Sequence, residues 1–164
     1  MARDALVSLA RRVGARLKKG KLKLATAESC TGGWIAQAVT SVPGSSQWFE
    51  RGFVTYSNQA KKELLGVRAR TLSSHGAVSE ETAREMASGA LARSRAQVAI
   101  AVTGVAGPGG GTRKKPVGTV CFAWSRKRSA PESVALRLRG SREGIRRRSV
   151  AFALEGLLER LEKK

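Results

Sequence analysis

The chain has few residues that form disulfides or bind metal ions: its 164 residues include only two cysteines and one histidine. Two cysteines cannot build a disulfide framework, and because Cys30 lies within a candidate site described below, we expect reduced thiols. One histidine and two distant cysteines also lack the usual spacing of zinc ligands. The composition therefore excludes a disulfide-stapled fold, and we expect no bound metal.

Long apolar runs are missing as well. No segment approaches the roughly 18 to 20 consecutive apolar residues that cross a bilayer, and the N-terminus lacks the apolar core of a signal peptide. We therefore expect no membrane contact and a soluble, cytoplasmic protein. A hydrophobic content of 41% allows one real core, so we expect residues 1–164 to form a single domain.

Acidic residues are scarce, with 12 Asp and Glu against 31 Lys and Arg, which gives a formal net charge of +19. The field of such a chain attracts polyanions, so nonspecific nucleic-acid binding stays open, and a nucleic-acid-binding module without hydrolase activity is the alternative function. However, no aromatic residues are interleaved with the basic clusters, and no nucleic-acid-binding motif accompanies them. We favour a solvated basic surface, produced by the arginine bias of a GC-rich coding sequence.

Hydrophobic periodicity indicates helices and strands in alternation. Helices are expected over residues 6–19, 35–39, 59–65, 79–91 and 142–161, and strands over 22–25, 53–56, 98–102, 117–124 and 133–138. Asn58 and Ser141 are the expected N-caps of the third and last helices, and residues 67–78 are expected to be loop with a turn or two of helix. Because the last two strands can pair as a hairpin, we predict an α/β fold, a three-layer α/β/α sandwich with a mixed β-sheet.

The segment 27–36 places Ser29 between a short apolar run and a glycine-rich helix start. The first N–H groups of a helix have no internal partner and can bind a phosphate or a developing oxyanion. Gly32 and Gly33 allow a ligand to approach closely. Ser29 is therefore a candidate nucleophile, although Ser29 and Thr31 are also typical helix-capping residues.

Polar or glycine-rich turns at Ser29, Tyr56 and Thr103 each follow an apolar strand. Because ligands of open α/β sheets bind beyond strand ends, these turns are expected to line one pocket. Thr103 and Gly104 begin a glycine-rich loop that either cradles a phosphate or forms a mobile lid, without the Gly-Lys-Ser/Thr ending of a Walker loop.

A serine nucleophile needs a base, and Lys61 is a better candidate than the single histidine, His75, which lies in a predicted loop. The positive end of the helix dipole and the net positive charge of the chain both lower the pKa of Lys61. A shift of this pKa from about 10.4 to roughly 7 also requires partial burial. Tyr56 can relay a proton or hold Ser29 and Lys61 in register. Alternatively, Lys61 and Lys62 are an ordinary exposed pair, and Tyr56 is a half-buried strand aromatic.

Three further residues have two interpretations each. Arg142 either binds a phosphate or carboxylate or is a solvated surface residue, and Glu28 either binds a sugar hydroxyl or caps a backbone group. Cys30 is either a thiol nucleophile or, as we favour, a small packing residue.

Five ordered segments resemble the CinA C-terminal domain family: 27–33, 52–58 with Lys61, 75–79, 103–108 and 115–120. The resemblance covers nearly the whole chain, and stand-alone members of this family are nicotinamide-nucleotide amidases. It implies hydrolysis of nicotinamide mononucleotide to nicotinate mononucleotide and ammonia, within NAD salvage, without metal or cofactor. Because only one helix precedes the Ser29 strand, we expect no separate N-terminal domain, which favours the free-standing amidase.

The resemblance also assigns roles and partners. Ser29 corresponds to the nucleophile, Lys61 to the base and Tyr56 to an assisting residue. Substrate-site positions are Glu28, Cys30, Thr31, Gly32, Gly33, Thr103, Gly104 and Arg142. The implied partner is a small-molecule substrate, and self-association into a homo-oligomer is expected.

Overall fold

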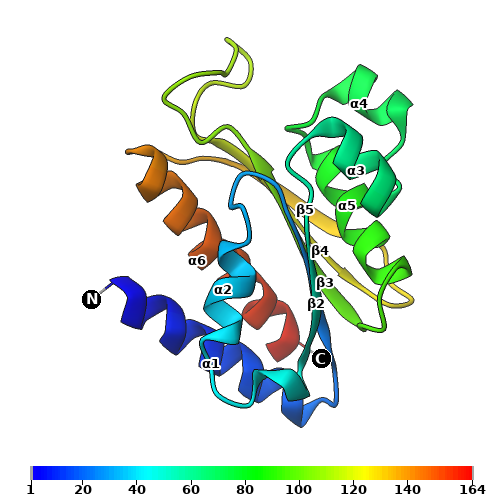
Figure 1. Ribbon diagram of the computed structural model, residues 1–164, viewed down its shortest axis with the longest axis vertical. Helices are drawn as coiled ribbons and strands as arrows, with labels where there is room; N and C mark the ends of the chain where they lie inside the picture. Colours follow the sequence, from blue (N-terminus) through cyan, green and yellow to red (C-terminus); the bar gives the residue numbers. More distant parts are fainter. Residues whose placement is uncertain (1, 164) are drawn as a thin grey trace.

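A computed structural model describes residues 2–163 and shows a single α/β domain built on one five-stranded sheet (Figure 1). The strands are β1 (Leu24–Glu28), β2 (Phe49–Val54), β3 (Val98–Gly104), β4 (Thr119–Arg126) and β5 (Glu132–Arg137), in the order β2-β1-β3-β4-β5. β1 runs parallel to β2 and β3, whereas β4 is antiparallel to both β3 and β5. The mixed sheet and the late hairpin are therefore confirmed.

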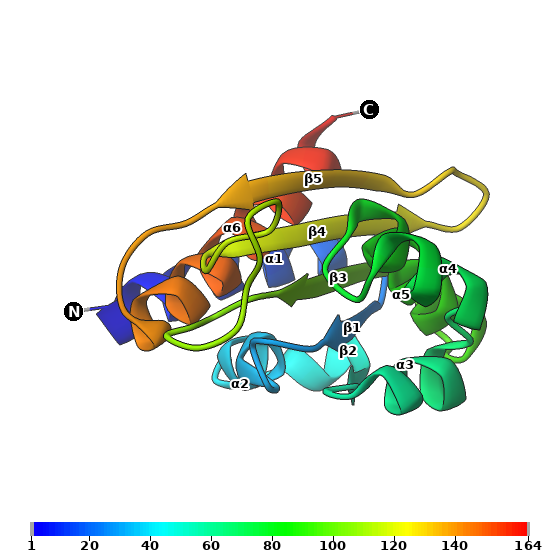
Figure 2. The ribbon, with the colours of Figure 1, turned by 90° about the horizontal axis from the view of Figure 1, so that it is seen from above.

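Helices cover both faces of the sheet, so the three-layer arrangement is confirmed (Figures 1 and 2). One layer contains α1 (Ala2–Lys19), α2 (Trp34–Thr40) and α6 (Arg142–Glu162), and the other contains α3 (Asn58–Leu65), α4 (Ala69–His75) and α5 (Glu80–Ala92). A short 3₁₀ turn, Ser45–Gln47, lies between α2 and β2. Within residues 2–163, no helix is both long and apolar enough to cross a membrane.

The two faces of the sheet carry side chains of different size. Leu24, Val98, Ile100, Phe122 and Trp124 pack against α1, α2 and α6. Alternate positions of the same strands face α5 and hold small residues: Ala25, Ala27, Ala99, Ala101, Cys121 and Ala123. Since successive strand residues point to opposite faces, this alternation builds one bulky core and one core of small side chains.

Several predicted boundaries are wrong by a few residues: β1 spans Leu24–Glu28 rather than the expected 22–25, and β4 spans Thr119–Arg126 rather than the expected 117–124. β2 ends at Val54, opposite the last residue of its only partner β1, so Thr55 and Tyr56 lie beyond the sheet. β3 continues through Thr103 and Gly104 because β4 pairs with both of them. The N-cap of α3 is Ser57 rather than Asn58, since the Ser57 hydroxyl accepts a hydrogen bond from the Ala60 N–H at 3.0 Å.

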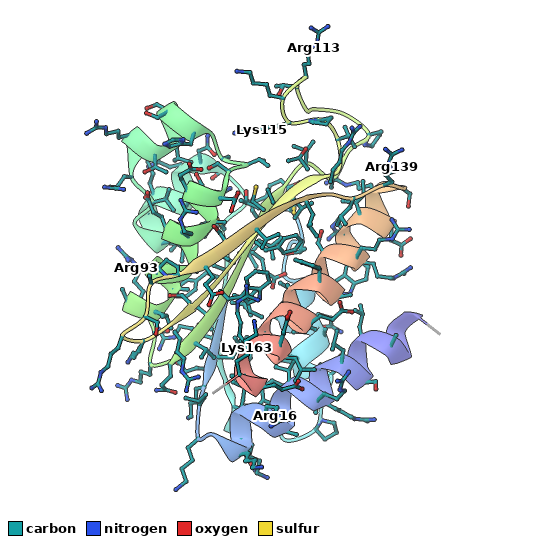
Figure 3. All side chains as sticks on the ribbon, turned by 180° about the vertical axis from the view of Figure 1, so that it is seen from behind. Arg16, Arg93, Arg113, Lys115, Arg139 and Lys163 are labelled. Carbon is teal, nitrogen blue, oxygen red and sulfur yellow. The ribbon has the colours of Figure 1, made fainter. Side chains whose placement is uncertain are left out.

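The basic side chains are dispersed. Figure 3 labels Arg113 at the tip of the loop after β3, Arg139 before α6, Arg93 at the end of α5, and Arg16 and Lys163 at the opposite end of the molecule. This distribution matches a solvated basic surface better than one nucleic-acid-binding face.

Candidate active site

The carboxyl ends of β1, β2 and β3 meet at one edge of the sheet. The Ser29 N–H donates to the Val102 carbonyl at 3.0 Å, and the Thr55 N–H donates to the Glu28 carbonyl at 2.8 Å. These bonds extend the strand pairing by one residue and hold the turns after the strands side by side. The structure therefore brings Ser29, Tyr56 and Thr103 to the same edge, as predicted.

Lys61 reaches this edge from α3. Its Nζ lies 2.9 Å from Ser29 Oγ, 3.1 Å from the Thr55 carbonyl oxygen and 3.4 Å from the Tyr56 carbonyl oxygen. The side chain is only 1% exposed, so the interpretation of Lys61 as an exposed residue is wrong. A lysine amine is thus held against a serine hydroxyl inside the protein.

Burial lowers the pKa of Lys61, because it penalises the charged ammonium form. Among the side chains of residues 5–163, no carboxylate lies within ion-pairing distance of Lys61 to oppose this effect. Desolvation is the largest cause of the shift, so the structure supplies the burial that the sequence argument required. The environment therefore favours the neutral amine, which is the form that acts as a base.

Tyr56 and Arg142 form the outer part of the site. Tyr56 is 61% exposed, so it is not a half-buried strand aromatic. Its hydroxyl accepts a hydrogen bond from Arg142 Nη2 at 3.1 Å, while Arg142 Nη1 donates to the Gly107 carbonyl at 2.7 Å. The main-chain carbonyl of Tyr56, rather than its ring, contacts Lys61. Arg142 thus joins Tyr56 to the glycine-rich loop.

Thr103 and Gly104 contact the backbone segments that surround the candidate site. The Thr103 hydroxyl is buried and donates to the Ala77 carbonyl at 2.9 Å, which ties β3 to the segment between α4 and α5. A Cβ at Gly104 would lie 2.9 Å from the Thr119 carbonyl oxygen. Gly104 is therefore required by the close approach of β4, and the open loop begins only after it.

The predicted anion site at the start of α2 is not present. α2 begins at Trp34, and its first N–H groups are already bound: Glu28 Oε1 accepts from Ile35 N at 2.8 Å and Oε2 accepts from Ala36 N at 3.0 Å. Glu28 Oε1 also accepts from the Thr31 hydroxyl at 2.6 Å. Glu28 is thus the capping residue, as its second interpretation stated, and neither Ser29 nor Thr31 caps α2.

Replacing Glu28 with alanine should destabilise the fold. Glu28 is fully buried, and its loss leaves two N–H groups and one hydroxyl without their acceptor. We expect the free energy of unfolding to fall by about 2–3 kcal/mol, measured by urea denaturation. A midpoint equal to that of the unmodified protein would contradict this role for Glu28.

The remaining site candidates differ in their chemistry. Burial raises the pKa of the Cys30 thiol to about 12, so the thiolate that a thiol amidase needs is disfavoured. Gly32 and Gly33 adopt φ values of +60° and +102°, which favour glycine in this turn.

The single histidine does not contact the Ser29–Lys61 pair. His75 is the last residue of α4, and its Nδ1 lies 3.4 Å from Glu81 Oε2, with no hydrogen bond to Ser29 or Lys61 in the described chain. The side chains of residues 5–163 contain no cluster of three or more His, Cys, Asp or Glu residues for a metal ion.

Two contributors to the site were missed in the sequence. The Thr55 carbonyl binds Lys61 through the main chain, which leaves no residue-type signal. Arg146 donates to the carbonyls of Cys30 and Thr31 from the start of a run of three arginines, and nothing in the run distinguishes it from its neighbours.

Comparison with known proteins identifies the family. A family model described as the CinA C-terminal domain matches residues 6–161. The chain belongs to the CinA C-terminal domain family. Its relatives in this CinA family include the nicotinamide-nucleotide amidohydrolase PncC of Escherichia coli K12, with 50% identity over 96% of this chain and 95% of that protein. PncC of Pseudomonas putida is 50% identical over 95% of this chain and 97% of that protein.

Solved structures of the CinA family agree with this fold. The crystal structure of the competence/damage inducible protein CihA from Agrobacterium tumefaciens has a TM-score of 0.93 at 48% identity, over 97% of this chain and 96% of that chain. A competence damage-inducible protein A from Klebsiella pneumoniae has a TM-score of 0.93 at 40% identity, over 96% of this chain and 98% of that chain. The resemblance to the CinA family and the expected fold are both confirmed.

Proposed function

We propose that the chain is a nicotinamide-nucleotide amidase that hydrolyses nicotinamide mononucleotide to nicotinate mononucleotide and ammonia, with Ser29 as nucleophile and Lys61 as base. The observation that carries this proposal is the buried Lys61 Nζ at 2.9 Å from Ser29 Oγ. The names of the relatives in Escherichia coli and Pseudomonas putida supply the substrate. They favour this activity over the nucleic-acid-binding alternative.

The contacts of Lys61 match the needs of a neutral amine. Such an amine has two N–H donors and one lone pair. The carbonyls of Thr55 and Tyr56 are acceptors only, and they take the two N–H donors. The lone pair is then left for the Ser29 hydroxyl proton. The buried carbonyls therefore orient Lys61 as a base toward the nucleophile.

The reaction follows from this arrangement. Lys61 accepts the Ser29 proton as Oγ attacks the carboxamide carbon, and the resulting ammonium gives that proton to the departing nitrogen, which leaves as ammonia. Lys61 then accepts a proton from water as the water attacks the ester, and returns it to Ser29 when the acid product leaves. The protons balance over one turnover.

Arg142 supplies positive charge beside the exposed Tyr56 ring, at the outer side of the Ser29–Lys61 pair. We place the anionic part of the nucleotide there, since a guanidinium binds phosphate through paired N–H groups. The product is the acid form of the substrate nucleotide, so the reaction belongs to the salvage of pyridine nucleotides.

Incubation of the purified protein with nicotinamide mononucleotide tests the proposal. We expect equal amounts of ammonia and nicotinate mononucleotide, measured by an enzymatic ammonia assay and by chromatography. Nicotinamide riboside, which lacks the phosphate, should be hydrolysed with a higher KM. Absence of ammonia release together with tight, salt-dependent DNA binding would instead support the basic binding module.

A further inference from the structure

The turn that carries the candidate nucleophile, residues 29–33, is tied to its surroundings at two points: the Ser29 N–H donates to the Val102 carbonyl at 3.0 Å, and the Thr31 hydroxyl donates to Glu28 Oε1 at 2.6 Å. Inside it, the Gly32 N–H donates to the Ser29 carbonyl at 3.0 Å, and the Trp34 N–H donates to the Thr31 carbonyl at 3.0 Å. Two consecutive glycines with positive φ make the rest of this backbone intrinsically permissive. A further contact on the carbonyls of the turn therefore reduces its conformational freedom.

Arg146 of α6 provides such a contact. Its Nε donates to the Cys30 carbonyl at 3.1 Å, and its Nη2 donates to the Thr31 carbonyl at 3.2 Å. The guanidinium also lies over the Trp34 ring, 5.5 Å from the centroid. A planar guanidinium presents its donors in a rigid fork, so it fixes both carbonyls in one relative orientation.

Arg146 differs from the next residue in its partners. Arg147 also lies over Trp34, at 5.6 Å, but its Nη2 donates to the Glu143 carboxylate at 3.1 Å. Among the side chains of residues 5–163, no carboxylate lies within 4 Å of the Arg146 guanidinium nitrogens to form an ion pair. The polar contacts of Arg146 are therefore directed to the turn after Ser29, whereas those of Arg147 stay within α6.

We infer that Arg146 is a positioning residue for the nucleophile turn, which it holds by two adjacent carbonyls so that Ser29 Oγ stays within hydrogen-bonding distance of Lys61. Each peptide unit is planar, so fixing the carbonyls of Cys30 and Thr31 fixes the chain path from Cys30 to Gly32, directly after Ser29. Lys61 is anchored independently by the carbonyls of Thr55 and Tyr56. Movement of the turn therefore separates the pair without releasing the base. As a statement about catalysis, the inference rests on the proposed amidase activity.

The test compares Arg146→Met, Arg146→Lys and the neighbouring Arg147→Met. In Arg146→Met, we expect kcat for nicotinamide mononucleotide to fall at least about tenfold, because small misplacements of reacting groups are costly. KM should change by less than about threefold, since Arg142 and Tyr56 are untouched. Arg146→Lys should recover part of kcat through one remaining donor, and Arg147→Met should retain the kcat of the unmodified protein.

Amide hydrogen exchange gives a readout that does not depend on the substrate. The Gly32 and Trp34 amides should exchange at least about tenfold faster in Arg146→Met, with melting temperature and core exchange unchanged, and should not change in Arg147→Met. Unchanged exchange in Arg146→Met overturns the inference, as does a kcat equal to that of Arg147→Met. A loss of kcat matched by global unfolding also overturns it, because the role is then only structural. An unmodified protein that releases no ammonia refutes the amidase proposal instead, and exchange still decides the role of Arg146.

Discussion

Replacing Ser29 with alanine is expected to abolish ammonia release from nicotinamide mononucleotide while leaving the fold intact. The change removes one buried oxygen atom, and Lys61 keeps its contacts with the carbonyls of Thr55 and Tyr56. Without a nucleophile, no acyl-enzyme forms, so kcat should fall by at least about 10³-fold. Steady-state ammonia release and circular dichroism together measure the two parts of this prediction.

Cys30→Ser separates the serine mechanism from a thiol mechanism. The Cys30 thiol is adjacent to Ser29 in the chain, but burial raises its pKa to about 12, so the thiolate is unfavourable at neutral pH. We expect Cys30→Ser to keep measurable turnover and Ser29→Ala to lose it. The opposite pattern would assign the nucleophile to the thiol and would refute the role of Ser29.

Replacing Lys61 with methionine should remove activity without destabilising the protein. Methionine is close to lysine in length and apolar, so it fills the same buried space without the desolvation penalty of the amine. We expect kcat to fall at least about 10²-fold, the range for loss of a general base, and the free energy of unfolding to stay equal or rise. Lys62→Met, at the adjacent and partly exposed position, is the matched control and should keep its kcat.

The pH dependence of stability provides a second readout for Lys61. Burial lowers the pKa of Lys61 in the folded protein below its ordinary value of 10.5. Between these two values the unfolded chain binds more protons than the folded one, so stability should rise with pH across this window. Lys61→Met should lack this rise, measured by urea denaturation at several pH values. Equal slopes in both proteins would show that Lys61 stays charged when folded.

The same shift sets the pH dependence of the reaction. Only the neutral amine accepts the Ser29 proton, so kcat/KM should increase with pH until Lys61 is deprotonated. Because burial lowers that pKa, the increase should be complete below the pH at which an ordinary lysine titrates.

Much of the fold could be predicted because local patterns and global packing agree. The apolar run at 98–102 is covered on both faces, and the predicted cap Ser141 accepts from the Gly144 N–H. The boundary errors arose where pairing, not residue type, decides the end of a strand. β2 ends because β1 ends, and β3 continues into Thr103 because β4 is present.

The residues of the candidate site could be predicted from the sequence, but the hydrogen bonds that join them to the rest of the fold could not. Ser29 and Lys61 follow elements whose ends meet at one sheet edge, and the structure brings them into contact. The helix start expected to bind an anion is occupied by Glu28, seven residues before the Ile35 N–H that it accepts. Contacts across such separations, like that of Arg146 with the Cys30 carbonyl, have no signature in composition or periodicity.

The unequal faces of the sheet determine where this enzyme can be redesigned. On the alanine-lined side, an added methyl group has little free volume to enter, so it would displace α5 as a rigid body. α5 begins just after Ser79, and the Ala77 carbonyl two residues earlier is bound to Thr103 beside the candidate site. Libraries intended to change substrate range should therefore leave the alanine side unaltered.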